Sequence, residues 1–215
     1  MLKPKTYRIL IILCASLFLG GCAVGQKIGY HDAELAINAS GNTMIAVTSL
    51  DGRPYVKSGE KDKTYIGTFR GGFGNPFNVS TESQKPLADD ITSVICASLQ
   101  KKGFACTPIS VEPIETQDQI INKLKVTKAM RLILLAINEW RSDTYTNTSL
   151  YYDIGLTVMD NQGARLAQAN AKGEDDLGGK AMNPPGHAKE EVPKAYKKKL
   201  ESLLNDPSVI NALMP

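Results

Sequence analysis

Two neighbouring segments in the second half of the chain alternate between apolar and polar residues, and this alternation limits the fold more than any other feature. Residues 150–160, LYYDIGLTVMD, place five apolar side chains on one face of an extended strand: Leu150, Tyr152, Ile154, Leu156 and Val158. Residues 131–140 are apolar and then alternate, and a turn over 160–163 leads into a third extended segment from residue 165. Three such strands in succession predict an antiparallel meander.

The rest of the chain alternates between strand and helix signals. Segments rich in β-branched and apolar residues predict strands at 43–50, 65–70 and 104–111. Apolar residues at helical spacing predict helices over 86–102, 116–126 and 192–204, and Asp206 is expected to cap a last turn. The expected order is strand, short strand, helix, strand, helix, three strands and helix. We therefore expect an α+β fold in which helices pack on one face of a mainly antiparallel sheet.

The first 22 residues combine a short positive segment, an apolar run of about eleven residues and the sequence LGGC, Leu19–Cys22. The run is too short to span a bilayer as a helix, which takes about 20 residues. The pattern is typical of a bacterial lipoprotein signal, cleaved before Cys22 after the sulfur has received a diacylglyceryl group. The alternative is an ordinary signal peptide with a stray cysteine. We expect a signal peptide over 1–21, a lipidated tether over 22–42 and a single periplasmic α+β domain over 43–215.

Lipidation of Cys22 would make membrane anchoring effectively permanent, since each buried methylene contributes about 0.8 kcal/mol and two or three acyl chains are attached. Ala23 follows Cys22, and the resemblance to lipoproteins without an aspartate at that position implies the outer membrane. We expect the protein on its periplasmic face.

The positive charge of the chain belongs to the signal. The formal net charge is +3, and residues 1–21 carry three basic residues and no acidic one, namely Lys3, Lys5 and Arg8. The mature chain is therefore close to neutral, and its composition gives no indication of a nucleic-acid partner.

Two cysteines remain after cleavage and lipidation, Cys96 and Cys106. Cys96 lies seven residues before Gly103, about 10 Å of helix, and Cys106 lies three residues after it, about 10 Å of strand. If the strand doubles back along the helix, the two sulfurs come level, and a disulfide there would contribute about 3 kcal/mol. The alternative is two small buried residues. Two cysteines with no nearby histidine do not make a zinc site.

The segment GTFRGGFGNPFN, residues 67–78, is rich in glycine and phenylalanine. It lacks the Lys-Ser or Lys-Thr of a phosphate-binding loop, and Asn75 before Pro76 favours extended geometry. One interpretation is a tight glycine turn joining a strand to a helix, with Gly72 and Gly74 at positive φ. The other is an interaction loop whose exposed side chains form a partner surface: Arg70, Phe73, Asn75 and Phe77.

Four lysines crowd the last long predicted helix: Lys194, Lys197, Lys198 and Lys199. They form either a solvated face or a contact for anionic lipid headgroups or glycan. Neither histidine, His31 or His187, belongs to a metalloprotease motif, and the chain has no GxSxG nucleophile elbow. We expect no enzymatic activity, no cofactor and no metal.

Several features together resemble the YajG-like bacterial outer-membrane lipoproteins. They are the LGGC motif, the strand IAVTSLDGRPYV with Asp51 and Arg53, the helix end LQKKGF, the meander and the terminal LESLLNDPSVINAL. This group is similar to the amino-terminal domain of TolB and to peptidoglycan synthase activator lipoproteins. The resemblance implies a lipoprotein whose periplasmic body works by contact, and it supplies no catalytic residue. The segment GGFGNPFN is not part of that pattern.

Three classes of function follow. The leading hypothesis is a non-catalytic interaction or assembly accessory with a protein partner in the cell envelope. The second is a carrier or chaperone for an envelope lipid or lipopolysaccharide, which would need an apolar pocket between helices and sheet. The third is an unrecognised hydrolase, which would need a cleft of converging titratable groups.

Overall fold

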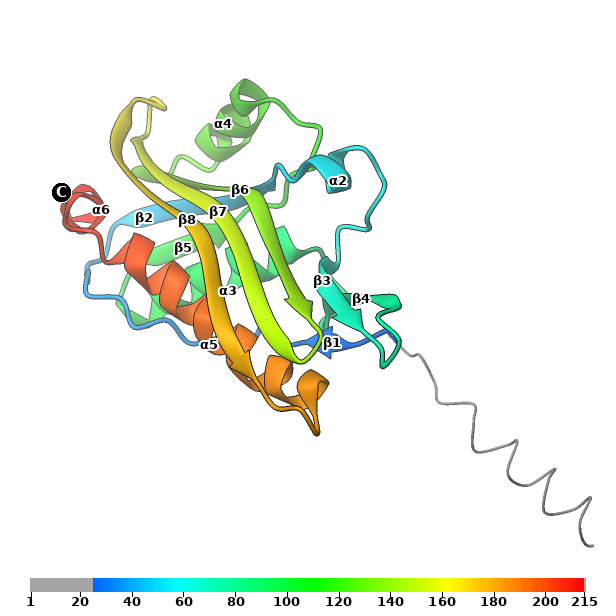
Figure 1. The fold of residues 1–215 in the computed structure, drawn as a ribbon. Coiled ribbons are helices and arrows are strands. Elements are labelled where there is room, and N and C mark those ends of the chain that lie inside the picture. The colour runs from blue at the N-terminus through cyan, green and yellow to red at the C-terminus, as the bar shows by residue number, and fades with distance from the viewer. Residues whose placement is uncertain (1–24, 215) are drawn as a thin grey trace, which may run out of the picture.

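The computed structural model describes residues 25–214, so Cys22 and the signal segment lie outside the described residues. Figure 1 shows a curled eight-stranded sheet with helices on both faces. In chain order the elements are β1 Lys27–Ile28, β2 Met44–Asp51, α2 Pro54–Lys57, β3 Tyr65–Arg70, β4 Pro76–Thr81, α3 Leu87–Lys101, β5 Ala105–Pro108, α4 Gln117–Val126, β6 Arg131–Thr144, β7 Asn147–Asp160, β8 Arg165–Gly179, α5 Pro184–Leu204 and α6 Pro207–Leu213.

The predicted meander is confirmed as β6, β7 and β8. One edge of β6 pairs with β7 in antiparallel register, from Arg131 opposite Asp160 to Thr144 opposite Thr148, and β7 pairs with β8 in the same way. The alternation of apolar and polar residues sets this register, because a slip by one residue would turn the apolar side chains to the solvent face. The predicted α+β class is confirmed.

The other edge of β6 is shared by two strands that lie end to end. The first half of β6 pairs with β2 in parallel, up to Ile137 opposite Asp51. The last residues of β6 pair with β3, also in parallel, from Ser142 opposite Gly67. The edge of β6 therefore changes its neighbour between residues 137 and 142.

The side chain of Arg53 fills this interval. It is fully buried, and its Nη1 donates to the carbonyl oxygens of Tyr65 (2.6 Å) and Trp140 (3.0 Å). Its Nε and Nη2 donate to the two carboxylate oxygens of Asp51, at 2.8 and 2.6 Å. A buried guanidinium is tolerated only when its donors are paired, and here they join β2, β3 and β6.

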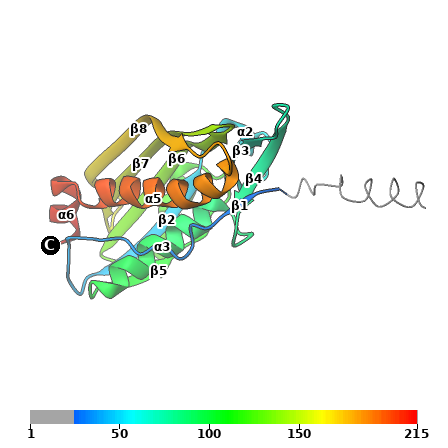
Figure 2. The ribbon, with the colours of Figure 1, turned by 60° about the horizontal axis from the view of Figure 1, so that its bottom comes forward.

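Helices α3, α5 and α6 pack on one face of the sheet and enclose the main core (Figure 2). At its centre, Trp140 donates through Nε1 to the hydroxyl of Tyr30 at 3.0 Å, and the Tyr30 ring lies 4.5 Å from that of Tyr196 in α5. Helix α4 packs on the opposite face, where Ile120 and Leu124 join a second, smaller cluster. The expectation of helices on one face therefore holds for three helices and is wrong for α4.

The tether expected over 22–42 is largely part of the folded body. Only Lys27–Ile28 form a strand, but Tyr30, Leu35 and Ile37 are buried in the main core. The backbone of Leu35 donates to Ser98 of α3, and that of Ala36 donates to Glu201 of α5, so this segment runs between the two helices. Its apolar residues recur at every second position, which suits an extended segment with one buried side.

Cys96 of α3 and Cys106 of β5 form the predicted disulfide, with their Cα atoms 5.4 Å apart. Strand β5 pairs in parallel with β2 and runs back along α3, which is the geometry that the spacing required.

We predict that Arg53→Met lowers the free energy of unfolding by about 3–5 kcal/mol, because it leaves the carboxylate of Asp51 buried without its partner. The measurement is urea denaturation of the purified protein. Arg70→Met is the matched control, since Arg70 makes the same two-bond contact with Asp143 at the surface, where water screens the charges. Equal losses in both variants would contradict the structural role given to Arg53.

Candidate functional site

The glycine-rich segment forms the tip of a hairpin between β3 and β4. The amide of Gly71 donates to the carbonyl of Asn75 at 2.9 Å, and Gly74 adopts φ +80°. The expected connection from strand to helix is therefore wrong. Pro76 begins a strand because the extended geometry imposed on Asn75 continues into β4. Positive φ is confirmed at Gly74 but not found at Gly72.

The four predicted interaction residues of this loop have different environments. Phe73 is 97% exposed at the tip, and Asn75 is exposed beside it. Phe77 is half-buried, with its ring against Gly71. Arg70 is held by Asp143 through Nε at 2.8 Å and Nη2 at 2.6 Å. Phe73 is therefore the member of this group whose apolar surface is available.

The predicted lysine face of α5 is largely paired within the protein. Lys194 contacts Glu191 at 2.7 Å and Lys197 contacts Glu201 at 3.7 Å. Among the described residues, Lys198 has no carboxylate within 4.0 Å. A single unpaired ammonium on this face gives less attraction for an anionic surface than the four charges of the sequence suggested.

Lys199 is not part of a solvated face but joins α5 to the sheet. Its ammonium contacts the carboxylate of Asp175 at 2.7 Å and donates to the hydroxyl of Tyr152 at 2.8 Å. The hydrogen bond from Lys199 lowers the pKa of the Asp175 carboxyl. Partial burial favours the neutral form of Lys199, but its bonds to Asp175 and Tyr152 outweigh this effect and raise its pKa.

A groove of about 540 Å³ lies between β8 and α5. Charged side chains dominate its lining: Asp175, Asp176, Glu191, Lys194, Lys198 and Lys199. Most of these groups are already bonded to one another across or beside the groove. The groove is thus a polar surface feature rather than an apolar pocket.

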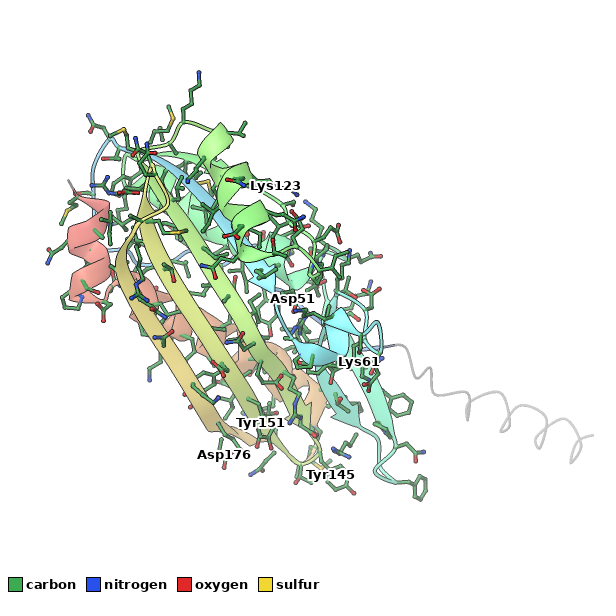
Figure 3. All side chains as sticks on the ribbon, turned by 90° about the horizontal axis from the view of Figure 1, so that it is seen from above. Asp51, Lys61, Lys123, Tyr145, Tyr151 and Asp176 are labelled. Atoms are coloured by element: carbon green, nitrogen blue, oxygen red, sulfur yellow. A yellow bond between two sulfur atoms is a disulfide. The ribbon has the colours of Figure 1, made fainter. Side chains whose placement is uncertain are left out.

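The second half of the β6–β7–β8 sheet leaves one face without a covering helix, and Figure 3 looks onto it. Helix α4 covers the other half of the same face, near Leu132 and Leu134. We call the uncovered part the open face and define it by six side chains: Glu139, Arg141, Tyr151, Asp153, Lys172 and Glu174. Their strand partners place them side by side, because Arg141 is opposite Tyr151 and Tyr151 is opposite Glu174.

Arg141 and Tyr151 form the centre of the open face. The Arg141 guanidinium carbon lies 4.1 Å from the centroid of the Tyr151 ring, a cation–π contact. Around this pair, Lys172 contacts Asp153 at 2.8 Å, and the hydroxyl of Tyr55 donates to Glu139 at 2.6 Å. The stack holds a planar cation and an aromatic ring in place, so little side-chain entropy is lost when a partner covers them.

The sequence stage missed the open face. The alternation of β7 assigned Tyr151 and Asp153 to the polar side of the strand, but the spacing does not tell which half of that side α4 would cover. The signal that could have found it is the concentration of tyrosine and arginine on a polar strand face, residue types that are enriched in binding hot spots.

Within residues 25–214, no helix is long and apolar enough to cross a membrane. In the same range, the described His, Cys, Asp and Glu side chains form no group of three that could hold a metal ion.

Comparison with models of known protein families finds no match. The curated protein sequences contain no significant match to the chain either. Among solved structures, the fold is similar to that of XCC0632 from Xanthomonas campestris, a DUF330 protein, with a TM-score of 0.52 and 8% identity over 87% of this chain and 94% of that chain. At this identity the likeness shows the fold alone.

Two further solved structures are more distant. PelC from Paraburkholderia phytofirmans, a dodecamer, has a TM-score of 0.40 and 15% identity over 81% of this chain and 96% of PelC. Lipoprotein GNA1162 from Neisseria meningitidis has a TM-score of 0.30 and 8% identity over 75% of this chain and 99% of that chain. Both scores are too low to support an inference about function.

We predict that Gly74→Val lowers the free energy of unfolding by about 1 to 3 kcal/mol, because valine is strained at positive φ. Gly72→Val is the matched control: it is two residues away, its φ is not positive, and neither glycine has an atom within 4 Å of the added Cβ. Thermal unfolding of both variants checks the prediction, and an unchanged melting temperature for Gly74→Val would contradict it.

Proposed function

We propose that the chain is a lipid-anchored protein of the bacterial outer membrane that acts on its periplasmic face as a non-catalytic interaction or assembly accessory. The sequence LGGC followed by Ala23 supports the anchor and the membrane, although Cys22 lies outside the described residues. The disulfide between Cys96 and Cys106 agrees with an oxidising compartment such as the periplasm. The resemblance to YajG-like lipoproteins stays a prediction.

The observation that carries the contact role is the stack of Arg141 on Tyr151 at the centre of the open face. Arginine and tyrosine are over-represented among the few residues that supply most of the energy of protein interfaces. The charged groups around the stack are of both signs, which favours a partner of mixed charge over a uniformly anionic polymer. We therefore assign the partner surface to the open face rather than to the lysines of α5.

The packing between helices and sheet argues against the lipid-carrier alternative. In this region, Tyr30, Trp140 and Tyr196 fill the centre of the core. A cavity lined by Ile28, Phe69 and other side chains has a volume of about 10 Å³. Such a volume is close to that of one water molecule and is far below what an acyl chain requires.

The hydrolase alternative finds little support in the charged groove between β8 and α5. Lys194 and Lys199 each have a carboxylate partner there, and the hydrogen bond from Lys199 lowers the pKa of Asp175. A general acid or base at neutral pH needs a carboxyl pKa that is raised toward 7 rather than lowered.

We predict that Arg141→Ala and Tyr151→Ala weaken recovery of a crosslinked envelope protein from intact cells, while the melting temperature stays nearly unchanged. Truncation of a binding hot spot costs about thirtyfold or more in affinity. Arg165→Ala and Tyr145→Ala are matched controls, because they remove the same residue types from exposed positions outside the open face. Equal recovery from all four variants would overturn the assignment of the partner surface.

A further inference from the structure

Three connections of the fold end at the same end of the sheet as the first described residue. Gly25 lies against β4, where the carbonyl oxygen of Asn78 is 3.2 Å from the position of an added Cβ. Strand β1 runs parallel to β4, so the chain before Gly25 leads toward the start of β4 and the hairpin tip. We call this end the anchor end and define it by Gly25, the hairpin tip 71–75, the turn 145–146 and the loop 180–183.

Register and contacts place the other two connections at the anchor end. Phe69 near the end of β3 is opposite Thr144, so the turn 145–146 follows beside the hairpin, and the Tyr145 hydroxyl lies 3.4 Å from the carbonyl of Gly72. Gly179 at the end of β8 is opposite Asn147, so the loop 180–183 starts at the same level. Figure 1 shows these connections gathered at one end of the molecule.

Each connection at the anchor end presents an apolar or aromatic side chain to solvent. Phe73 is 97% exposed, Met182 is 98% exposed and Tyr145 is 47% exposed. Phe73 and Met182 are the two most exposed of the large apolar side chains in the described residues. Exposed tips of this kind, on separate loops and at one level, suit the boundary between headgroups and acyl chains of a bilayer better than a curved protein groove.

The charged side chains near these tips are neutralised within the protein. Arg70 is bonded to Asp143 by two hydrogen bonds, and Lys180 contacts Glu190 at 3.0 Å. Paired charges are less costly to bring close to an apolar phase than isolated ones.

The reach of the anchor limits how far this end can lie from the membrane. Cys22 precedes Gly25 by three residues, which span at most about 11 Å even when fully extended. If the acyl chains on Cys22 are in the bilayer, Gly25 is held within about that distance of the headgroups. A fold tethered so tightly cannot turn freely, and the parts nearest Gly25 must lie against the lipid.

We propose that the anchor end rests on the lipid bilayer and that Phe73 and Met182 enter the interfacial region of its periplasmic leaflet. This inference rests on the proposed lipidation of Cys22. It assigns the hairpin tip to lipid rather than to a protein partner, and it leaves the open face directed along the side of the molecule, accessible to other envelope proteins.

Tryptophan fluorescence of the full-length acylated protein tests the proposal. Phe73→Trp and Met182→Trp are each purified from membranes and reconstituted into vesicles of phosphatidylethanolamine and phosphatidylglycerol, some of whose acyl chains carry bromine close to the headgroup. The native Trp140 is 1% exposed, and the emission of the parent protein is subtracted. We expect the added emission to shift to shorter wavelength and to lose most of its intensity in the brominated vesicles.

Val126→Trp provides the matched control. Val126 is 80% exposed at the end of α4, and its neighbour Lys125 lies beside Gly163, in the turn at the opposite end of the sheet. Tryptophan at 126 is expected to keep its emission in brominated vesicles. Quenching at 73 and 182 no stronger than at 126, or a blue shift at 73 without quenching, would overturn the proposal, since the latter means that protein covers the tip.

The intact mass of each purified variant separates this inference from the function on which it rests. A mass without acyl groups would overturn the lipoprotein assignment and the orientation together. A correctly acylated protein whose tryptophan at 73 is not quenched would overturn the orientation alone.

Discussion

The buried guanidinium of Arg53 is the contact on which the arrangement of the sheet depends. Strand β6 is longer than either neighbour on one edge, so β2 and β3 divide that edge and leave an interval between residues 137 and 142. Unpaired backbone carbonyls in a buried interval would be costly, and Arg53 donates to those of Tyr65 and Trp140. The carboxylate of Asp51 neutralises its charge. One side chain thus fixes where β2 ends and where β3 begins.

The division of that edge separates two surfaces. Because β3 starts late along β6, the β3–β4 hairpin extends at the end of the sheet where β1 and the first described residue also lie. Helix α4 packs near the opposite end of β6 and leaves the open face around Arg141 and Tyr151 uncovered. In our account the end of the sheet meets the membrane and the face meets a partner, so the same strands serve both contacts without interference.

The sequence predicted the elements better than it predicted their neighbours. The meander follows from the period-two alternation of β6 to β8, and the disulfide follows from the helix and strand lengths around Gly103. Strand β4 was missed because a glycine turn before Pro76 is also compatible with a connection to a helix. The burial of residues 30–39 was missed because a short alternating segment does not specify what will pack against it. The open face, the position of α4 and the pairing of the α5 lysines depend on contacts distant in sequence, which residue spacing does not encode.

Anchoring through Cys22 is the central claim, since the orientation and the envelope role both depend on it. Cells expressing Cys22→Ser, Cys14→Ser or the parent protein can be labelled with a palmitate analogue and their membranes separated. We predict that Cys22→Ser loses the label and leaves the membrane fraction, whereas Cys14→Ser, altered within the signal segment, keeps both properties of the parent. A Cys22→Ser protein that stays labelled and still sediments with the membranes would contradict the account.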